Sequence, residues 1–376
     1  MGKQNGKFVS WSPLCAVLVA VVFCQVGCGG KRNELVKIGY LQNTGSLPLF
    51  VAEEKGYFAA EGIREEATPI ATSNQLVDAL VAGNLQAFPE SSAYPVLAVE
   101  LQSPGRLKIF SASAITKQHP FDCVLVKENS PIKKISDLAG KRIGVFPGST
   151  ATSLLRKYLK DSNVEVSGIT FVPIPPQTQV GALLEGSIEA LHSYEPTTAI
   201  ALARRGIRKL YGSVYAELVE PNLQGVGVVS VRFLREQPET ARKVIRVFEK
   251  AMAFMRNNEA ETRRIMGQRL KLEERVAQTA VLLEVQAHAD LDRSALQKYA
   301  DMLAGLGELK GNVNVDGLSA ADSLEFSLLQ DPQQRDLSLG QQLAHFVQKD
   351  RTAVSQFETS KPPLRGARER ATLMAE

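Results

Sequence analysis

The chain has few of the residues that build covalent or metal-bound sites. Its 376 residues include four cysteines, four histidines and one tryptophan, and aromatic residues make up only 6%. Cys15, Cys24 and Cys28 lie at the N-terminus, which leaves Cys123 alone in the rest of the chain. A disulfide framework is therefore excluded, and we interpret Cys123, which starts an apolar run, as a small buried residue. The histidines stand too far apart to indicate a zinc site.

An excess of one charge and the usual catalytic motifs are also missing. The formal net charge is only +4, which is too mild to indicate nucleic-acid binding. Gly140-Lys141 is followed by Arg142 instead of the Ser or Thr of a phosphate-binding loop, and Ser230 stands where a dinucleotide turn needs its third glycine. A serine-hydrolase elbow is absent as well. The sequence thus favours a binding protein without catalytic residues, cofactor or metal.

A secretory signal is indicated at the N-terminus. Lys3 and Lys7 precede an apolar run, Leu14 to Cys24, that is too short to span a membrane. The run ends in Gln25-Val26-Gly27-Cys28, which resembles a bacterial lipobox except that Gln25 replaces the usual aliphatic residue. We expect residues 1–28 to be a lipoprotein-type signal and Cys28 to be lipidated, with ordinary signal cleavage as the alternative. The expected location is extracytoplasmic, with the chain anchored to a membrane.

A strand-to-helix passage occurs twice in the chain. Residues 36–50 read VKIGYLQNTGSLPLF and residues 141–154 read KRIGVFPGSTATSL. In each copy a short β-type run breaks into a Gly-Ser pair, Gly45-Ser46 or Gly148-Ser149, that opens a helical pattern. The offset between the two pairs recurs further on, where it separates Gly83 from Gly186. This duplication predicts two lobes of similar build.

Short strands and helices alternate in both copies, which is typical of a doubly wound, mostly parallel α/β sheet. The predicted strands of the two copies are 36–40, 63–67, 85–88, 143–146, 170–174 and 188–191. The chain is expected to cross to the second lobe after residues 107–112 and to return through Gly225 to Val231, so that two crossings form a hinge. We predict a first lobe of residues 35–115 and 228–330, and a second lobe of residues 116–227.

The last third of the chain has a helical pattern. Apolar residues recur at three- and four-residue spacing from Ala241 to Met255, and Pro238 suits the first turn of such a helix. Further helices are predicted at Glu273 to Ala287 and Ser294 to Ala304, packed on the first lobe. Apolar residues become sparse after about Gln330, so we expect residues 331–376 to form a partly mobile C-terminal extension.

The two helix starts are the first candidate ligand contacts. Backbone N–H groups at a helix start lack intrahelical partners, and a neighbouring hydroxyl adds a donor and an acceptor. The alternative is plain helix capping by Ser46 and Ser149, worth about 1 kcal/mol each, but the duplication favours a ligand site. The candidate residues at the two starts are Gln42, Asn43, Gly45, Ser46, Gly148, Ser149 and Thr150.

The segments after the third strands supply the second set of candidates, because ligands of open α/β sheets collect beyond the carboxyl ends of the strands. We expect Ser91 and Ser92 from the first lobe, and Tyr194 and Glu195 from the second. Tyr194 would form a wall of the site, and Glu195 would accept a hydrogen bond from a ligand amine or N–H. Alternatively, Glu195 favours only its own helix N-terminus, worth about 0.3 to 1 kcal/mol. Spacing alone leaves both roles open.

Three runs together resemble a known family. They read LPLFVAEEKGYFAAEGI from Leu47, GKRIGVFPGSTA from Gly140 and ALLEGSIEALHSYEP from Ala182. The chain resembles the type II solute-binding proteins of ABC importers, in the branch for nitrate, alkanesulfonates, taurine and thiamine-pyrimidine precursors. The resemblance implies a two-lobe Venus-flytrap fold that closes on its ligand and docks on a permease. It also implies a role in the ligand pocket for Tyr194-Glu195-Pro196, where the family commonly has Trp, then Asp or Glu, then Pro.

The function expected from these observations is solute binding for import. A carboxylate in the cleft repels a bare inorganic anion, which favours a small polar organic ligand of sulfonate, taurine-like or pyrimidine type. The expected partners are this ligand, an ABC permease with its ATPase, and the membrane, and the protein is expected to be a monomer. Two alternatives stay open: a same-fold enzyme of thiamine-pyrimidine or menaquinone-type metabolism, and a lipoprotein that senses its ligand.

Overall fold

Two β-sheets organise the described part of the chain. The computed structural model describes Gly2 and residues 34–320. The first sheet has six strands in the order β11-β4-β10-β3-β1-β2, and the second has five in the order β7-β6-β8-β5-β9. The strands of the first sheet are β1 (Glu34–Tyr40), β2 (Ile63–Pro69), β3 (Ala87–Ser92), β4 (Leu107–Ile115), β10 (Asn222–Ser230) and β11 (Glu284–Ala287). Those of the second are β5 (Asp122–Lys127), β6 (Arg142–Val145), β7 (Thr170–Pro173), β8 (Ala190–Tyr194) and β9 (Ile207–Tyr211).

Both sheets repeat one mixed arrangement. In the first sheet β1 runs parallel to β2 and β3, while β10 pairs antiparallel with β3 and β4. In the second sheet β6 runs parallel to β7 and β8, while β5 pairs antiparallel with β8 and β9. The predicted α/β fold with two similar sheets is confirmed, and the duplicated passages contain the central parallel strands β1 and β6.

The chain passes between the sheets twice. Strand β4 belongs to the first sheet and β5 to the second, and the chain returns between β9 and β10. Strand β10 pairs with β4 from Asn222 onward and with β3 from Gly225 onward. The return to the first sheet therefore comes earlier in the chain than the lobe boundary that we drew from the sequence at Val228.

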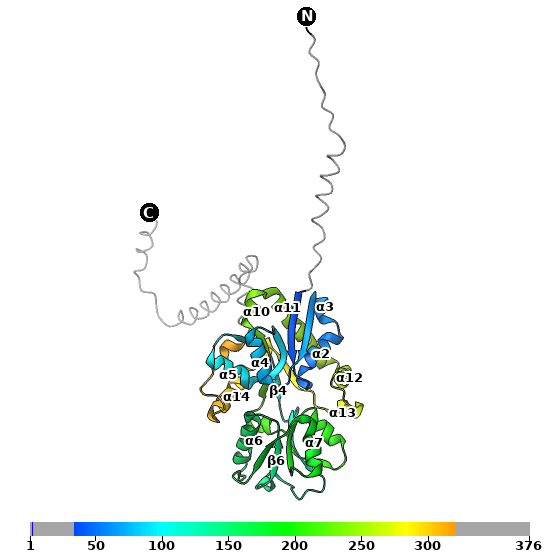
Figure 1. Cartoon of the computed structure of the whole chain (residues 1–376), viewed down its shortest axis with the longest axis vertical. Coiled ribbons are helices and arrows are strands. Elements are labelled where there is room, and N and C mark those ends of the chain that lie inside the picture. The colour runs from blue at the N-terminus through cyan, green and yellow to red at the C-terminus, as the bar shows by residue number, and fades with distance from the viewer. Residues whose placement is uncertain (1, 3–33, 321–376) are drawn as a thin grey trace, which may run out of the picture. The chain divides into compact units, whose positions relative to one another are not determined.

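Helices flank each sheet (Figure 1). Those that follow strands of the first sheet are η1 (Thr44–Ser46), α2 (Leu47–Glu54), α3 (Tyr57–Ala60), α4 (Ser73–Ala82), α5 (Ala93–Gln102), α10 (Val231–Glu236), α11 (Pro238–Asn257), α12 (Glu259–Leu270), α13 (Glu274–Thr279), η3 (His288–Asp290), α14 (Arg293–Gly305) and η4 (Asp316–Leu318). Those of the second sheet are η2 (Ile135–Leu138), α6 (Ser149–Asp161), α7 (Pro176–Glu185), α8 (Thr197–Ala203) and α9 (Val214–Leu218). Figure 1 shows α6 and α7 beside the second sheet, apart from α2 to α5.

The apolar face of α11 packs on the first sheet, as its periodicity predicts. Phe248 stacks on Phe110 of β4 with ring centroids 5.2 Å apart, and its edge contacts Phe58 of α3 at 5.8 Å. Both aromatic geometries are favourable, and the three rings are almost fully buried. The helix predicted from Ala241 to Met255 is confirmed.

The helix that we predicted from Glu273 to Ala287 is wrong in its second half. Helix α13 ends at Thr279, and Glu284–Ala287 forms β11. This strand pairs antiparallel with β4, from Glu284 opposite Ala114 to Ala287 opposite Ser111. The open edge of β4 supplies backbone partners that are distant in sequence, and this pairing overrides the local helical pattern.

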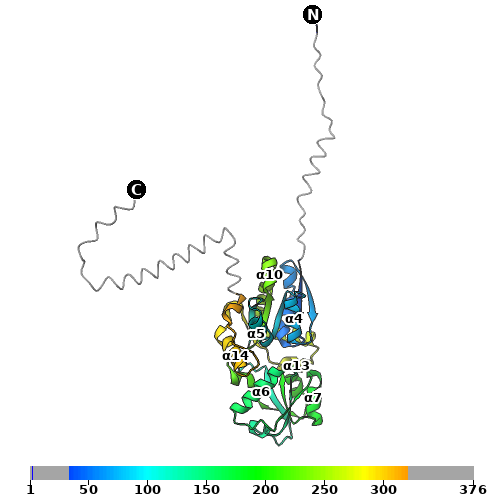
Figure 2. The same cartoon turned by 60° about the vertical axis from the view of Figure 1, so that its left-hand side comes forward.

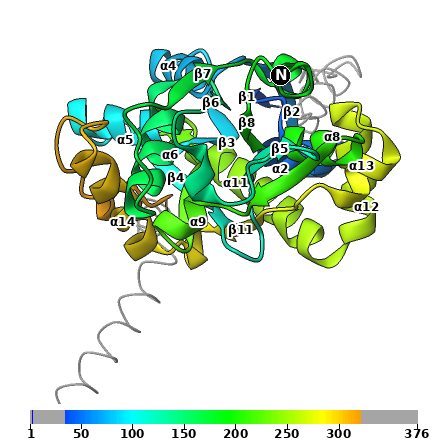
Figure 3. The ribbon, with the colours of Figure 1, turned by 90° about the horizontal axis from the view of Figure 1, so that it is seen from below.

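Helices also join the two sheets. Helix α13 contacts α8 of the second sheet, and Figure 3 shows them side by side. Helix α14 packs on α5 and lies near α6 in Figure 2. Beyond α14, Glu308 accepts a hydrogen bond from the hydroxyl of Ser153 on α6. These contacts link the part that follows β10 to the second sheet.

Two predictions fall outside the described residues. These are the signal of residues 1–28 with Cys28, and the C-terminal extension of residues 331–376. Within residues 34–320, no helix is both long and apolar enough to cross a membrane.

Candidate functional site

The first helix start is tightly organised by its own side chains. Asn43 accepts a hydrogen bond from the backbone N–H of Gly45 at 3.1 Å, and the Ser46 hydroxyl donates to the carbonyl of Leu41 at 2.6 Å. Ser46 is fully buried, and its side chain caps no helical N–H. The hydroxyl that we predicted as a ligand contact is thus used to close the turn. Gln42 is exposed beside it.

Thr44 in the same turn was missed by the sequence reasoning. Its hydroxyl oxygen is buried and has no hydrogen-bond partner among the described residues. A buried polar atom without a partner is unfavourable, because it has lost its hydrogen bonds to water. Thr44 is therefore a better candidate than Ser46 for donating to a ligand at this helix start.

The second helix start leaves its backbone groups open. Gly148 precedes α6 with a φ of 127°, a conformation that favours glycine, and no side chain caps the helix. Gly148 is exposed and Thr150 is partly buried. Because α6 begins at Ser149, the backbone N–H groups of its first turn lack intrahelical acceptors and are oriented to bind an acceptor.

Tyr194, at the end of β8, is held in an aromatic cluster. Its ring stacks on Phe121 at a centroid distance of 5.5 Å and is tilted against Phe146 at 5.6 Å and Tyr215 at 5.7 Å. Its hydroxyl shares a hydrogen bond with that of Tyr215, and burial raises the pKa of Tyr194 well above its ordinary value. The ring is therefore neutral and held in place, and its predicted role as a wall of the ligand site stays a prediction.

The buried carboxylate of Asp122 holds this aromatic cluster in place. Asp122 accepts hydrogen bonds from the backbone N–H groups of Val214 at 2.8 Å and Tyr215 at 3.4 Å, and from the Ser213 hydroxyl. It also bonds to Nε2 of His192 at 2.8 Å. Asp122 thus caps α9 and fixes β8 against β5, which sets the positions of Tyr194 and Tyr215.

Glu195 serves its own helix. The carboxylate is 4% exposed and accepts from the backbone N–H of Ala199 at 3.3 Å. Burial raises the pKa of Glu195 to about 7, against the lowering effects of the Ala199 and Val281 N–H groups and of the Lys209 and Arg263 charges. Val281 follows α13, so Glu195 lies at the contact between α8 and α13. These contacts support the alternative in which Glu195 stabilises its own helix start.

Strand β3 runs further than predicted, and it carries Ser91 and Ser92. We expected a loop after Phe88, but the strand continues to Ser92. Ser91 is buried and its hydroxyl donates to the carbonyl of Ser92 at 3.1 Å, while Ser92 Oγ accepts from the N–H of Tyr94 at the start of α5. Both hydroxyls therefore already have local partners.

Glu90 on this strand is the clearest residue that the site prediction omitted. It is 8% exposed, and the Ser113 hydroxyl of β4 donates to its Oε2. Its carboxyl lies against Gly45 of the first helix start and Gly225 of β10. Burial raises the pKa of Glu90 to about 7, opposed by the bond from Ser113. Glu90 lies in the segment Pro89-Glu90-Ser91-Ser92 that we expected to reach the site, but we ended the preceding strand too early to see that its side chain is buried.

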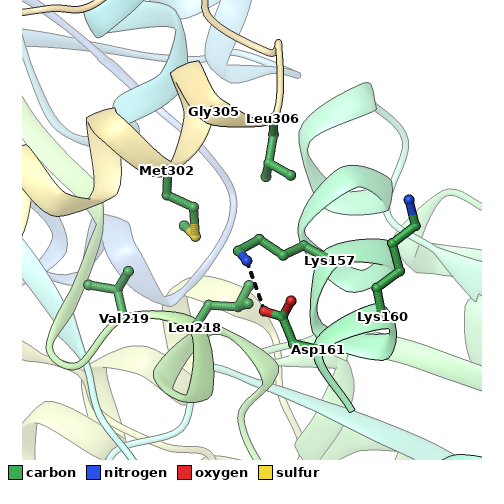
Figure 4. Close-up of a pocket in the computed structure, with 8 residues that line it drawn as sticks. All are labelled: Lys157, Lys160, Asp161, Leu218, Val219, Met302, Gly305 and Leu306. Atoms are coloured by element: carbon green, nitrogen blue, oxygen red, sulfur yellow. Dashed lines mark hydrogen bonds and ion pairs between the residues drawn. The ribbon is translucent and has the colours of Figure 1, made fainter. Parts of the chain in front are cut away.

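A groove of about 440 Å³ lies elsewhere, between α6, α9 and α14 (Figure 4). It is lined by Lys157, Lys160, Asp161, Leu218, Val219, Met302, Gly305 and Leu306. Lys157 and Asp161, one turn apart on α6, form an ion pair at 2.8 Å along its edge. Lys157 lies roughly 12 Å along α6 from Ser149, so this groove and the predicted helix start are at different ends of the helix.

The described residues show little sign of metal or nucleophilic chemistry. In residues 34–320, no three His, Cys, Asp or Glu side chains gather in a way that would hold a metal ion. Cys123 is buried, and burial raises the pKa of its thiol to about 12. A thiol with this pKa stays protonated at neutral pH, which makes it a poor nucleophile.

Comparisons with known proteins agree with this architecture. A Bacillus subtilis (strain 168) protein named for aliphatic sulfonate binding is 26% identical over 253 residues, which is 64% of this chain and 74% of that protein. The periplasmic aliphatic sulphonate binding protein SsuA from Escherichia coli superimposes with a TM-score of 0.63 at 18% identity, over 76% of this chain and 92% of its own. The desulfurization enzyme DSZB superimposes with a TM-score of 0.59 at 18% identity, over 79% and 99%.

The family assignment completes this comparison. The NMT1/THI5-like family matches residues 43–262, which include both helix starts and the strands from β2 to β10. The resemblance to solute-binding proteins stated from three sequence runs is confirmed, as is the two-lobe α/β fold that it implied. The chain belongs to the NMT1/THI5-like family.

Proposed function

We propose that this protein is the extracytoplasmic solute-binding component of an ABC import system. It binds a small polar organic molecule of sulfonate, taurine-like or pyrimidine type between its two lobes and delivers it to a permease. The observation that carries the proposal is the repeated unit of strand, glycine turn and helix on two sheets that are joined by two crossings. The sulfonate-binding names of similar proteins support the same class of ligand.

In this proposal each lobe contributes a helix start. The uncapped first turn of α6, after Gly148, binds the acceptor end of the ligand through backbone N–H groups. Thr44 and the backbone at Gly45 contact it from the first lobe, and Tyr194 forms an aromatic wall. Lobes that separate and close around two crossings suit a protein that captures and then releases a solute.

Calorimetry on the full chain tests the proposal with a panel of taurine, alkanesulfonates, nitrate and pyrimidines. We expect one molecule of at least one organic solute to bind with a dissociation constant in the micromolar range. At a concentration of about 100 times that constant, the solute should raise the free energy of unfolding by about 2.7 kcal/mol. Failure of every solute to bind or to stabilise the protein refutes the proposal.

The membrane anchor is a separate part of the proposal. The lipobox-like run ending in Cys28 supports a lipid-anchored protein held outside the cytoplasm. Expression of Cys28→Ser in a bacterial host should move the protein from the membrane fraction to the soluble extracytoplasmic fraction. An unchanged distribution of this variant would remove lipidation from the proposal and leave solute binding standing.

An enzymatic role is the second candidate, because DSZB has a similar fold and is an enzyme. The buried thiol of Cys123, with its raised pKa, argues against Cys123 as a nucleophile. Incubation of each solute that binds, followed by mass spectrometry, separates the two functions. A solute-binding protein returns its ligand unchanged, whereas an enzyme accumulates product.

A further inference from the structure

A bulge in β3 redirects Glu90. Phe88 pairs with Val228 and Ser91 pairs with Val226, so that Pro89 and Glu90 together lie opposite the single residue Gly227. The extra residue in a bulge breaks the alternation of side chains and re-aims one of them. Here the bulge stands near the carboxyl end of β3, where the first helix start also lies, since η1 and β3 are in contact.

Two glycines make room for the carboxyl group. A Cβ atom at Gly45 would lie 1.8 Å from Oε1 of Glu90, and one at Gly225 would lie 2.9 Å from Cδ. Neither distance is possible for a real side chain, so alanine at either position would collide with the carboxyl. The glycine of the first helix start and the glycine of the returning strand thus bound a slot that Glu90 fills.

Glu90 is the least satisfied of the three buried acidic residues among the described residues, Glu90, Asp122 and Glu195. Asp122 has backbone, hydroxyl and imidazole partners, and Glu195 has backbone N–H groups. Within residues 34–320, the Ser113 hydroxyl is the only hydrogen-bond donor to Glu90, and no basic side chain forms an ion pair with it. Its Oε1 therefore has no donor among the described residues, and it is not one of the fully enclosed side-chain atoms, so a donor from outside the protein can reach it.

The neighbouring turn contains a buried polar atom without a partner. The Thr44 hydroxyl oxygen is buried without a partner and lies one residue before Gly45, whose Cα is adjacent to Glu90. If Glu90 only stabilised the helix start, a backbone N–H of that start would donate a hydrogen bond to its carboxylate. No described N–H donates to it, since the Gly45 N–H donates to Asn43.

We propose that Glu90 is a specificity-determining residue of the ligand site and selects a solute with an ammonium or N–H donor over an equivalent solute that has only an anionic group. This inference rests on the proposed solute-binding function. The donor completes the coordination of Oε1 and neutralises the buried charge, while the acceptor end of the same solute meets the start of α6. A solute that brings only an anion would leave Glu90 unpaired and be repelled by its ionised form.

Matched pairs of probes test the inference by calorimetry on the full chain. Taurine and ethanesulfonate differ by an ammonium group, and 4-amino-2-methylpyrimidine and 2-methylpyrimidine differ by an amino group. In at least one pair, the donor-bearing member should bind about tenfold to a hundredfold more tightly, as expected for a charge-assisted hydrogen bond. Glu90→Ala should reduce this ratio to near one, and Glu90→Gln should reduce it for taurine. The control, Glu66→Gln, makes the same change at an exposed position of β2 and should leave the ratio unchanged.

The pH dependence of taurine binding provides a test that needs no variant. Taurine keeps both charges between about pH 5.5 and pH 8, whereas Glu90 gains its charge in this range. Its surroundings on η1, β4 and β10 are Gly45, Ser113 and Gly225, none of which is charged. We expect the taurine affinity of the wild type to rise with pH and that of Glu90→Gln to rise less.

The outcomes separate this inference from the proposed function. If ethanesulfonate and 2-methylpyrimidine bind as tightly as their partners, or if the ratio survives in Glu90→Ala, the inference is overturned and solute binding stands. If no member of either pair binds to the wild type, both are overturned. If the thermal melting curve of a variant shows that it is unfolded, the pH measurement on the wild type takes the place of that variant.

Discussion

Replacing Glu90 with Gln should change the stability of the protein in a pH-dependent manner. The carboxyl group has an ordinary pKa of 4.5 and a pKa of about 7 in the folded protein, because it is buried. Between these values the unfolded chain loses the proton while the folded protein retains it. Glu90 therefore contributes stability that is fully present below about pH 4.5 and is lost as the pH rises through 7.

The size of this effect follows from the two pKa values. Each unit of difference corresponds to about 1.4 kcal/mol, so Glu90 removes about 3 kcal/mol from the free energy of unfolding between about pH 4.5 and pH 8. Gln has nearly the same shape, still accepts from Ser113 and does not ionise. The Glu90→Gln variant should thus be about as stable as the wild type near pH 4.5 and up to about 3 kcal/mol more stable near pH 8.

Urea denaturation of both proteins at several pH values between about 4.5 and 8 measures the difference directly. Glu195 also has a raised pKa, but it is present in both proteins, and its contribution cancels in the difference. Glu66→Gln serves as the exposed control and should follow the wild type at every pH. Parallel stability curves for the wild type and Glu90→Gln would show that the carboxyl is not buried in the way described.

Substitutions at three further positions test the surroundings of the site by thermal or urea unfolding. Asp122→Ala should cost about 3 to 5 kcal/mol, because it leaves the His192 ring and the start of α9 without their acceptor; a loss below about 1 kcal/mol would contradict this. Gly45→Ala should destabilise the protein by roughly 2 kcal/mol or more through its collision with Glu90, and the same change should cost much less in a Glu90→Ala background. Tyr194→Ala should cost about 3 to 5 kcal/mol and Tyr194→Phe about 1 kcal/mol, since the ring contacts outweigh the single hydroxyl contact; equal losses would refute that ranking.

Local sequence patterns predicted the elements that depend on local chemistry. The period of apolar residues in α11 reflects one face buried on the first sheet, and the Gly-Ser pairs stand at the starts of α2 and α6. The duplication predicted two similar sheets, because each copy contains its own strand, turn and helix. The strand β11 was not predictable in this way, since its partner β4 lies more than a hundred residues earlier and supplies the hydrogen bonds that make it a strand.

The same limit explains why Glu90 was overlooked. The third strand predicted from the sequence ends at Phe88, just before Pro89, and a proline has no N–H to donate in a sheet. The structure accommodates Pro89 in a bulge opposite Gly227, and β3 continues to Ser92. This bulge depends on the pairing with β10, which comes much later in the sequence, so the local sequence around Pro89 does not predict it. The bulge moves Glu90 from an expected loop to a buried position against the first helix start.

The sequence also suggested a carboxylate in the cleft but favoured Glu195, and the contacts distinguish the two residues. Glu195 accepts a hydrogen bond from the Ala199 N–H of the helix that follows it, and a further one from the N–H of Val281. Its charge is therefore already solvated by the backbone. Glu90 has the same chemistry and a similar pKa but only one hydroxyl partner, so its burial is explained best by a partner that arrives with the ligand. A donor-bearing ligand remains the expected solute, with Glu90 instead of Glu195 as the residue that recognises it.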